Sequence, residues 1–129
     1  GLPLVEAVGA DLGRVLLNLF SNAFYAVRQH QRQRPAEVAY VPTVSVSTRQ
    51  RDELVEIRVR DNGLGIPEAV RDKIFQPFFT TKPAGEGTGL GLSLSYDIVT
   101  KGHGGTLTVL SQEEKFTEFL VSLPLNQAG

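Results

Sequence analysis

The chain has 129 residues, and its 13 Lys and Arg against 14 Asp and Glu give a formal net charge of −1. This charge creates no basic field that would hold a polyanion, which argues against nucleic-acid binding. With 41% hydrophobic and 21% charged residues, the composition is typical of one globular domain, here residues 1–129, that buries a core. The sequence has no Cys and two His, which excludes disulfides, thiol catalysis and a metal site rich in Cys or His.

No apolar stretch approaches the roughly 20 residues that a membrane-spanning helix needs, and residues 1–13 lack the layout of a signal peptide. We therefore expect a cytoplasmic domain without direct membrane contact. Because the sequence contains no Met, we also expect it to be a fragment of a longer protein. That parent protein could itself be anchored in a membrane.

The first predicted element is a helix over residues 11–30, where apolar side chains recur at spacings of three and four and Asp11 is available as N-cap. Residues 29–42 are rich in Gln and Arg and contain two prolines, which predicts an exposed connection whose role is left open. Residues 43–48 and 54–61 alternate apolar and polar side chains, which predicts a β-hairpin.

Residues 68–74 follow a proline and predict a short helix, and residues 76–89 predict a loop rich in Gly, Thr and Pro. A second major helix is expected over residues 90–100, ended by glycines. Residues 106–110 and 119–123 alternate well enough to predict two final strands. Separate strand pairs and separated helices favour an α+β fold, with helices on one face of a mixed, mostly antiparallel sheet.

Two asparagines, Asn18 and Asn22, lie four positions apart on the first predicted helix and therefore on one face, at the edge of its apolar side. Asn is unfavourable inside a helix, so two such side chains beside the core need partners. Those partners are either groups of the protein or a bound ligand, and the spacing alone leaves both open.

A second polar segment, DNGLGIP at residues 61–67, directly follows a predicted strand. Gly63 and Gly65 allow a sharp turn and the close approach of a ligand. Asp61, at the end of the strand, could accept a hydrogen bond from an exocyclic amine inside an apolar pocket. A plain turn is the alternative, because Asp-Asn-Gly is also a common turn sequence.

A glycine at every second position of GEGTGLGL, residues 85–92, leads into the second major helix. Exposed backbone N–H groups at the start of a helix favour anions such as phosphate. The spacing matches neither a dinucleotide fingerprint nor a P-loop. Before it, residues 74–82 hold three Phe that either belong to the core or anchor a lid, and Lys82 could meet a phosphate.

Taken in this order, these segments resemble the catalytic ATP-binding domain of sensor histidine kinases, in the GHKL ATPase superfamily, from about residue 11 to residue 124. The matching boxes are residues 18–23 for the N box, 61–65 for the G1 box, 75–79 for the F box and 87–92 for the G2 box. The resemblance implies a two-layer α/β sandwich of the Bergerat type, with ATP between the helices under a flexible lid over about residues 67–87.

By this resemblance, Asp61 reads the adenine amino group and Thr117 assists near the base. Asn22, with Asn18, holds the Mg²⁺ that bridges the phosphates, and Lys82 neutralises charge on the γ-phosphate. Asn18 and Lys82 are thus the implied catalytic residues, in a reaction driven by positioning and electrostatics. The other implied nucleotide-binding residues are Gly63, Gly65, Ile66, Ile74, Gly87, Thr88, Gly89, Leu90, Gly91 and Leu92.

The ATP-hydrolysing relatives carry a Glu base at the place that Asn18 fills here. An amide cannot take the proton of an attacking water, so transfer to a protein side chain is favoured over hydrolysis. The resemblance implies that the acceptor is a His on a separate dimerisation domain of the same parent protein. A later relay would reach the receiver domain of a response regulator, and we expect His30 and His103 of this chain to be structural.

Three positions depart from the common kinase pattern. Tyr25 stands where many members carry a phosphate-contacting Lys, Phe116 replaces a usual Gly, and Gly102 adds a residue before the following glycines. Two alternatives are kept: a non-catalytic nucleotide-binding module whose lid signals by ordering, and a serine kinase similar to anti-sigma factors. A His-bearing dimerisation segment in the parent protein would favour the histidine kinase.

Overall fold

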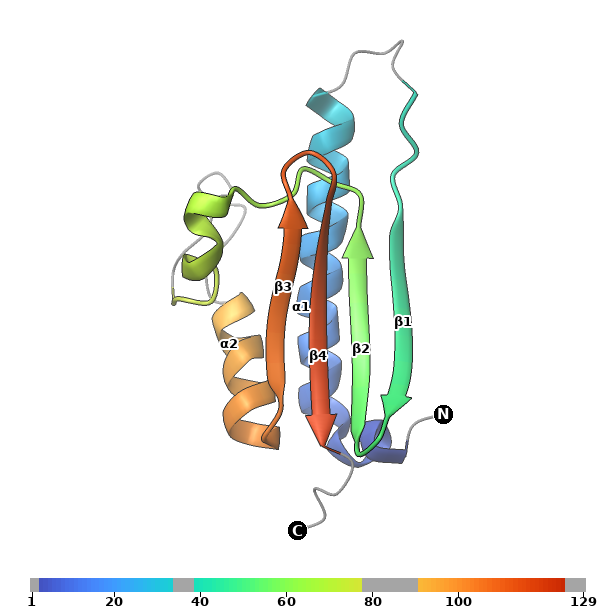
Figure 1. Ribbon diagram of the computed structural model, residues 1–129, viewed down its shortest axis with the longest axis vertical. Helices are drawn as coiled ribbons and strands as arrows, with labels where there is room; N and C mark the ends of the chain where they lie inside the picture. The colour runs from blue at the N-terminus through green and yellow to red at the C-terminus, as the bar shows by residue number, and fades with distance from the viewer. Residues whose placement is uncertain (1–2, 34–38, 78–90, 125–129) are drawn as a thin grey trace.

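The computed structural model describes residues 3–33, 39–77 and 91–124. In chain order, its elements are α1 (Pro3–Gln33), β1 (Val44–Arg51), β2 (Leu54–Asp61), the 3₁₀ helix η1 (Glu68–Lys73), α2 (Gly91–Asp97), the π-helical turn η2 (Ile98–Gly102), β3 (Thr106–Gln112) and β4 (Phe116–Pro124). The strands form one sheet in the order β1-β2-β4-β3, and the helices lie on one face of it (Figure 1). The predicted α+β class and its two layers are therefore confirmed.

The pairing of the strands confirms the expected mostly antiparallel sheet and sharpens it. All three strand pairings among the described residues are antiparallel, so this part of the sheet is purely antiparallel and not mixed. Short turns reverse the chain between β1 and β2 and between β3 and β4, which requires antiparallel neighbours. β4 then pairs with β2 in the opposite direction.

The core lies between α1 and the helix-facing side of the sheet. On α1 the buried apolar side chains follow the predicted spacing of three or four: they are Leu12, Val15, Leu19, Ala23 and Val27. On the two central strands every second side chain is buried: Val55, Ile57, Val59, Phe119, Val121 and Leu123. Each fully buried Leu or Val contributes about 1.5–3 kcal/mol, so this contact holds the layers together. Among the described helices, none is both long and apolar enough to cross a bilayer.

Several element boundaries differ from the predictions. Helix α1 begins at Pro3 instead of residue 11, so Asp11 is an interior helix position and not an N-cap. Proline suits a first helical turn because its missing N–H needs no partner there. The last strand begins at Phe116, earlier than predicted, and the Arg60 guanidinium lies 4.1 Å from the centre of the Phe116 ring. This cation–π contact helps an aromatic residue to begin the strand.

The second helix is shorter than predicted and ends in a π-helical turn. α2 covers seven residues, and η2 continues to Gly102, the residue that is extra relative to the common pattern. A π turn accommodates one additional residue within a helix. The Gly104 N–H then donates to the Thr100 carbonyl oxygen at 3.1 Å and the Gly105 N–H to that of Val99 at 2.9 Å. These bonds end the helix at the glycines, as predicted.

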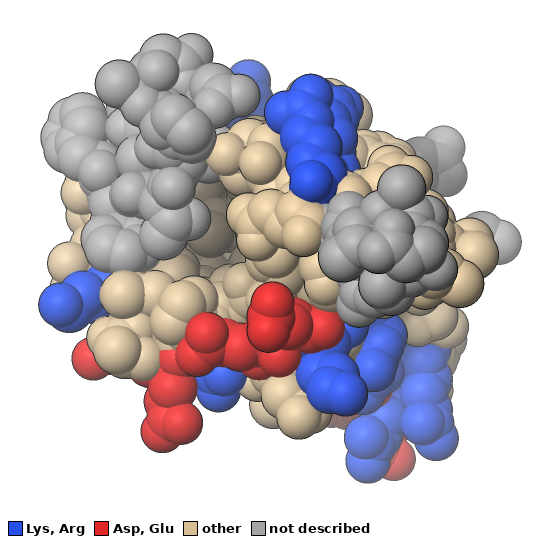
Figure 2. Space-filling model, turned by 90° about the horizontal axis from the view of Figure 1, so that it is seen from above, with Lys and Arg blue, Asp and Glu red and all other residues tan. Residues whose placement is uncertain are grey.

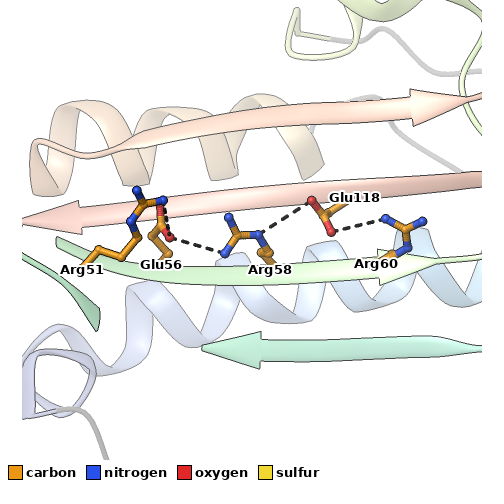
Figure 3. A network of polar contacts seen from close by, with 5 residues as sticks. All are labelled: Arg51, Glu56, Arg58, Arg60 and Glu118. Atoms are coloured by element: carbon orange, nitrogen blue, oxygen red, sulfur yellow. Dashed lines mark hydrogen bonds and ion pairs between the residues drawn. The ribbon is translucent and has the colours of Figure 1, made fainter. Parts of the chain in front are cut away.

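The face of the sheet away from the helices carries a ladder of charges (Figure 3). Glu56 lies between Arg51 at 3.9 Å and Arg58 at 3.4 Å. Glu118 lies between Arg58 at 3.9 Å and Arg60 at 3.6 Å. Isolated surface ion pairs stabilise little, whereas a network that shares partners holds its side chains in place. The two faces of β2 therefore differ sharply, with the core on one and charge on the other.

Two described residues other than glycine have a positive φ: Asp52, at 52°, between β1 and β2, and Glu114, at 62°, between β3 and β4. Asp tolerates this region better than Glu does. We expect Glu114→Gly to raise the free energy of unfolding by about 0.5–1 kcal/mol, because glycine adopts this conformation without steric cost. Urea unfolding measures the change. Glu113→Gly is the matched control and should not stabilise; equal effects of both variants would contradict the prediction.

Candidate functional site

A row of polar side chains crosses the end of the sheet on its helix-facing side. Asp61 on β2 lies directly opposite Thr117 on β4, and Thr117 lies opposite Ser111 on β3. Residues opposite one another in a sheet share a face, so these three interrupt a face that is otherwise apolar. Asp61 and Thr117 are each only 4% exposed. Buried polar groups in a row need a specific reason, which makes this end of the sheet the candidate site.

The Asp61 carboxylate is the chemically unusual group of this row. Burial raises the pKa of Asp61 from its ordinary value of 3.8 to about 6, although a hydrogen bond from Gly63 and the charge of Arg60 lower it in part. The Gly63 N–H donates to Asp61 Oδ1 at 2.8 Å. At neutral pH the side chain is therefore a buried anion that accepts hydrogen bonds. Strongly perturbed buried carboxylates are typical of binding and catalytic sites.

The loop after Asp61 is held between α1 and the β3–β4 hairpin. A Cβ on Gly63 would lie 2.6–2.7 Å from the backbone and Cβ of Ala26, so only glycine fits there. Gly65 has a φ of +75° and lies against Gln112. The two glycines were predicted to allow a sharp turn and close approach. In the structure, the atoms that lie closest to these two glycines belong to Ala26 and Gln112.

Asn62 anchors this loop to the segment that follows α1. The Thr43 N–H donates to Asn62 Oδ1 and Asn62 Nδ2 donates to the Val41 carbonyl oxygen, both at 2.8 Å. The backbone carbonyl oxygen of Asn62 accepts from the Tyr40 hydroxyl at 2.9 Å and from His30 Nδ1 at 3.3 Å. The described part of the predicted exposed connection is thus attached to the site. Sequence reasoning missed these contacts.

Asn18 connects α1 to the start of α2. Its Nδ2 donates to the Gly91 carbonyl oxygen and to Ser95 Oγ, both at 3.2 Å. Asn22 lies one turn further along α1, and Ala26, the neighbour of Gly63, one turn beyond that. One face of α1 therefore runs from Gly91, at the start of α2, to the loop after Asp61. The Asn18 nitrogen has protein partners, which answers part of the question left open by the sequence.

The apolar residues expected around the base share one cluster. Ile74 is buried in the main core, and Ile66 and Leu92 pack against that core while remaining partly exposed. The Phe75 ring lies 5.1 Å from that of Tyr96, measured between centroids. Phe75 also packs against the core, while Phe78 and Phe79 lie outside the described residues.

Part of the predicted site lies outside the described residues. This holds for the predicted residues Lys82, Gly87, Thr88, Gly89 and Leu90, and for residues 78–87 of the expected lid. Within the described part of the chain, no three His, Asp or Glu side chains gather as a metal site would require. Asn18 and Asn22 remain the candidate metal ligands. Tyr25 lies half-buried on α1.

Figure 2 looks onto the end of the molecule where these loops lie. Asp and Glu side chains form a band across it, and Lys and Arg side chains lie on both sides of the band. The described surface in this view therefore has both signs of charge.

Asp61 predicts a specific pH dependence of stability. Because its pKa is raised from 3.8 to about 6, the folded protein binds this proton more tightly than the unfolded chain. The contribution of this tighter proton binding to the free energy of unfolding is present below pH 4 and is lost as the pH rises through 6. We expect Asp61→Asn to stabilise the ligand-free protein at pH 7.5 by about 1–3 kcal/mol and to flatten its stability between pH 4 and 6.

Urea unfolding across this pH range measures the effect. Asp72→Asn changes an exposed carboxylate of η1 and should leave the pH dependence as it is. An Asp61→Asn variant that keeps the wild-type pH dependence would show that burial of this carboxylate has no energetic consequence.

The hydrogen bonds of Asn18 generate a second prediction. Asn18→Asp replaces the donating nitrogen with an acceptor that faces the Gly91 carbonyl oxygen. We expect a loss of about 1–3 kcal/mol in the free energy of unfolding. Asn22→Asp is the control on the same helix face and should cost less. Equal losses in the two variants, measured by urea unfolding, would contradict the role of the Asn18 nitrogen.

Comparisons with known proteins agree with this geometry. The family of histidine kinase-, DNA gyrase B-, and HSP90-like ATPases matches residues 7–127. The chain is 42% identical over 125 residues to the sensor histidine kinase ZraS of Escherichia coli strain K12, covering 97% of this chain and 24% of ZraS. It is 36% identical over 124 residues to the sensor protein FixL of Bradyrhizobium diazoefficiens, covering 96% of this chain and 22% of FixL. The chain thus spans about a quarter of these curated relatives.

Solved structures show the same likeness. The catalytic domain of the histidine kinase ThkA, in a nucleotide-free form, matches with a TM-score of 0.70 and 32% identity, covering 88% of this chain and 66% of that one. The mycobacterial sensor histidine kinase MprB matches with a TM-score of 0.69 and 32% identity, covering 89% of this chain and 70% of that one. The chain belongs to the family of histidine kinase-, DNA gyrase B- and HSP90-like ATPases, and within it is an ATP-binding catalytic domain of the sensor histidine kinase type.

Proposed function

We propose that this domain binds ATP with Mg²⁺ and donates the γ-phosphoryl group to a His on a separate dimerisation domain of its parent protein. The phosphoryl group would then pass to the receiver domain of a response regulator in two-component signalling, with the domain in the cytoplasm. The observation that carries the proposal is the buried Asp61 carboxylate, which lies beside Thr117 and at one end of the α1 face that holds both asparagines.

Adenine recognition follows from the chemistry of Asp61. A pKa of about 6 leaves the carboxylate ionised at neutral pH, so it accepts a hydrogen bond from the exocyclic amine of the base. The partly exposed Ile66 and Leu92, beside the buried Ile74, supply apolar contact for the flat faces of the ring. One directional polar group beside apolar side chains suits a purine.

The phosphate end of the nucleotide would lie along α1 towards α2. The nitrogen of Asn18 is engaged by Gly91 and Ser95, so the amide oxygen is the atom available to a cation. Mg²⁺ binds oxygen ligands, and the amide oxygens of Asn18 and Asn22 fit this preference. When bound there with the nucleotide, Mg²⁺ neutralises charge on the phosphates. Lys82 and the backbone of residues 87–91 complete the proposed phosphate site.

Phosphoryl transfer is favoured over hydrolysis by the surroundings of residue 18. A carboxylate there would face the Gly91 carbonyl oxygen without a donor, whereas the amide donates to it at 3.2 Å. This position therefore suits an amide, which cannot deprotonate water. In the proposed reaction, an imidazole nitrogen of the acceptor His bonds to the γ-phosphorus, and the bond from that phosphorus to the ADP oxygen breaks.

The histidines of this chain do not suit the acceptor role. His30 is 4% exposed, and its Nδ1 donates to the Asn62 carbonyl oxygen. The Nε2 atom of His103 is buried. An acceptor nitrogen must reach the γ-phosphate from outside, so these positions support an acceptor on another domain.

Calorimetric titration with ADP and with a non-hydrolysable ATP analogue, with and without Mg²⁺, tests the binding step. We expect Mg²⁺-dependent binding, its loss in Asp61→Ala, and in Asn22→Ala a weakening mainly of the Mg²⁺-dependent part. Wild-type affinity in a folded Asp61→Ala variant would contradict the assignment of the adenine site.

Transfer is tested separately with γ-labelled ATP and a purified dimerisation domain from the parent protein. Label on the dimerisation domain that depends on this chain supports the kinase. Tight nucleotide binding without any transfer would instead support a non-catalytic nucleotide-binding module. Transfer to a serine of a partner would support the serine kinase alternative.

A further inference from the structure

The hydroxyl group of Ser111 has three polar partners at the edge of the candidate base site. The Ile66 N–H donates to Ser111 Oγ at 2.7 Å. Ser111 Oγ lies 2.9 Å from the Phe116 carbonyl oxygen, to which it donates, and 3.1 Å from Thr117 Oγ1. One side chain thus joins the G1-type loop to both ends of the β3–β4 turn.

Counting donors and acceptors fixes the direction of the third contact. A serine hydroxyl has one proton and two lone pairs. The carbonyl oxygen of Phe116 can only accept, so it takes the Ser111 proton, and the Ile66 N–H takes one lone pair. Only a lone pair is then left for Thr117, which must donate. The single hydroxyl proton of Thr117 is therefore used on Ser111.

This direction sets the chemical character of the neighbouring site. With its proton engaged, Thr117 presents lone pairs, and the ionised Asp61 on the adjacent strand presents lone pairs as well. Both buried groups accept hydrogen bonds and do not donate. An amino group on a purine, with two N–H donors, complements such a pair. A keto oxygen at the same position would face acceptors alone, which is unfavourable in a buried site.

We propose that Ser111 is a positioning residue that fixes the Thr117 hydroxyl as an acceptor and thereby makes the site select 6-amino over 6-keto purine nucleotides. The inference rests on the proposed function, in which Asp61 and Thr117 face the base. It goes beyond that function by assigning part of the base specificity to a side chain one strand away from Asp61.

The test compares ADP with IDP, which has a keto group where ADP has the amine. Calorimetry gives both dissociation constants, and their ratio measures the selectivity. In Ser111→Ala the Thr117 proton is released and can donate to the keto oxygen. We expect the preference for ADP to fall about three- to tenfold. Ser111→Thr retains a hydroxyl at this position and should keep the wild-type ratio.

A double-mutant comparison separates this role from a general loosening of the site. In a Thr117→Val background no hydroxyl remains for Ser111 to direct, so Ser111→Ala should not change the ratio further. If Ser111→Ala weakens ADP and IDP by the same factor, the inference is overturned, because a structural defect does not distinguish the bases. Thermal unfolding reports whether each variant is folded.

If Ser111→Ala does not fold, the ratio of the ADP and IDP dissociation constants in Thr117→Val is the test. Removal of the buried lone pairs should also lower the preference for ADP, and an unchanged ratio overturns the inference. A wild-type chain that binds ADP but shows no selectivity against IDP contradicts this inference and leaves nucleotide binding intact. A folded wild-type chain that binds neither nucleotide contradicts the proposed function itself, and this inference with it.

Discussion

The contact between Gly63 and Ala26 fixes the end of β2 against α1. A Cβ at position 63 would come within 2.6–2.7 Å of Ala26, so the backbone after Asp61 lies directly on the helix. Because both layers are rigid packed elements, this contact sets where the carboxylate lies relative to Asn22, one helical turn from Ala26. The proposed site needs a fixed distance between Asp61, which is directed at the adenine, and Asn22, which is directed at the phosphates.

The site is assembled from groups that make the ligand-free protein less stable. Burial of Asp61 raises its pKa to about 6, which means that ionising this carboxyl costs more in the folded protein than in the unfolded chain. Charges and hydrogen-bonding groups that a ligand would complement are typical of binding sites and are a recurrent source of lost stability. The apolar contact of α1 with β2 and β4 supplies the stability that tolerates this loss.

Sequence patterns predicted the layers well because burial imposes them directly. The spacing of three and four on α1 and the alternation on β2 both report which side chains face the core, and both were confirmed. Element ends were predicted less well, since the start of α1 at Pro3 and the π turn before His103 leave no mark in hydrophobic periodicity. The glycine-rich motif at residues 61–67 pointed to Asp61, because the turn that follows this residue needs glycine at positions 63 and 65.

The contacts that complete the site could not be predicted in the same way. Asn62 has four polar neighbours drawn from α1 and from the segment before β1. Ser111 bonds to Ile66, which is 45 positions away in the chain. Asn and Ser are common surface and turn residues, so their presence indicates nothing until the folded chain brings their partners together. Pairing of this kind depends on the three-dimensional arrangement and not on local pattern.

The order of the strands has a consequence for association between molecules. β1 is an outer strand, and the N–H and C=O groups along its free edge are a template for pairing with another chain. Its residues after Val46 are Ser, Thr, Arg, Gln and Arg, and Arg51 takes part in the charge ladder. Positive charge and polarity along an edge discourage stacking of strands from neighbouring molecules. Arg51, which takes part in the charge ladder on the open face of the sheet, thus also opposes aggregation through the edge strand.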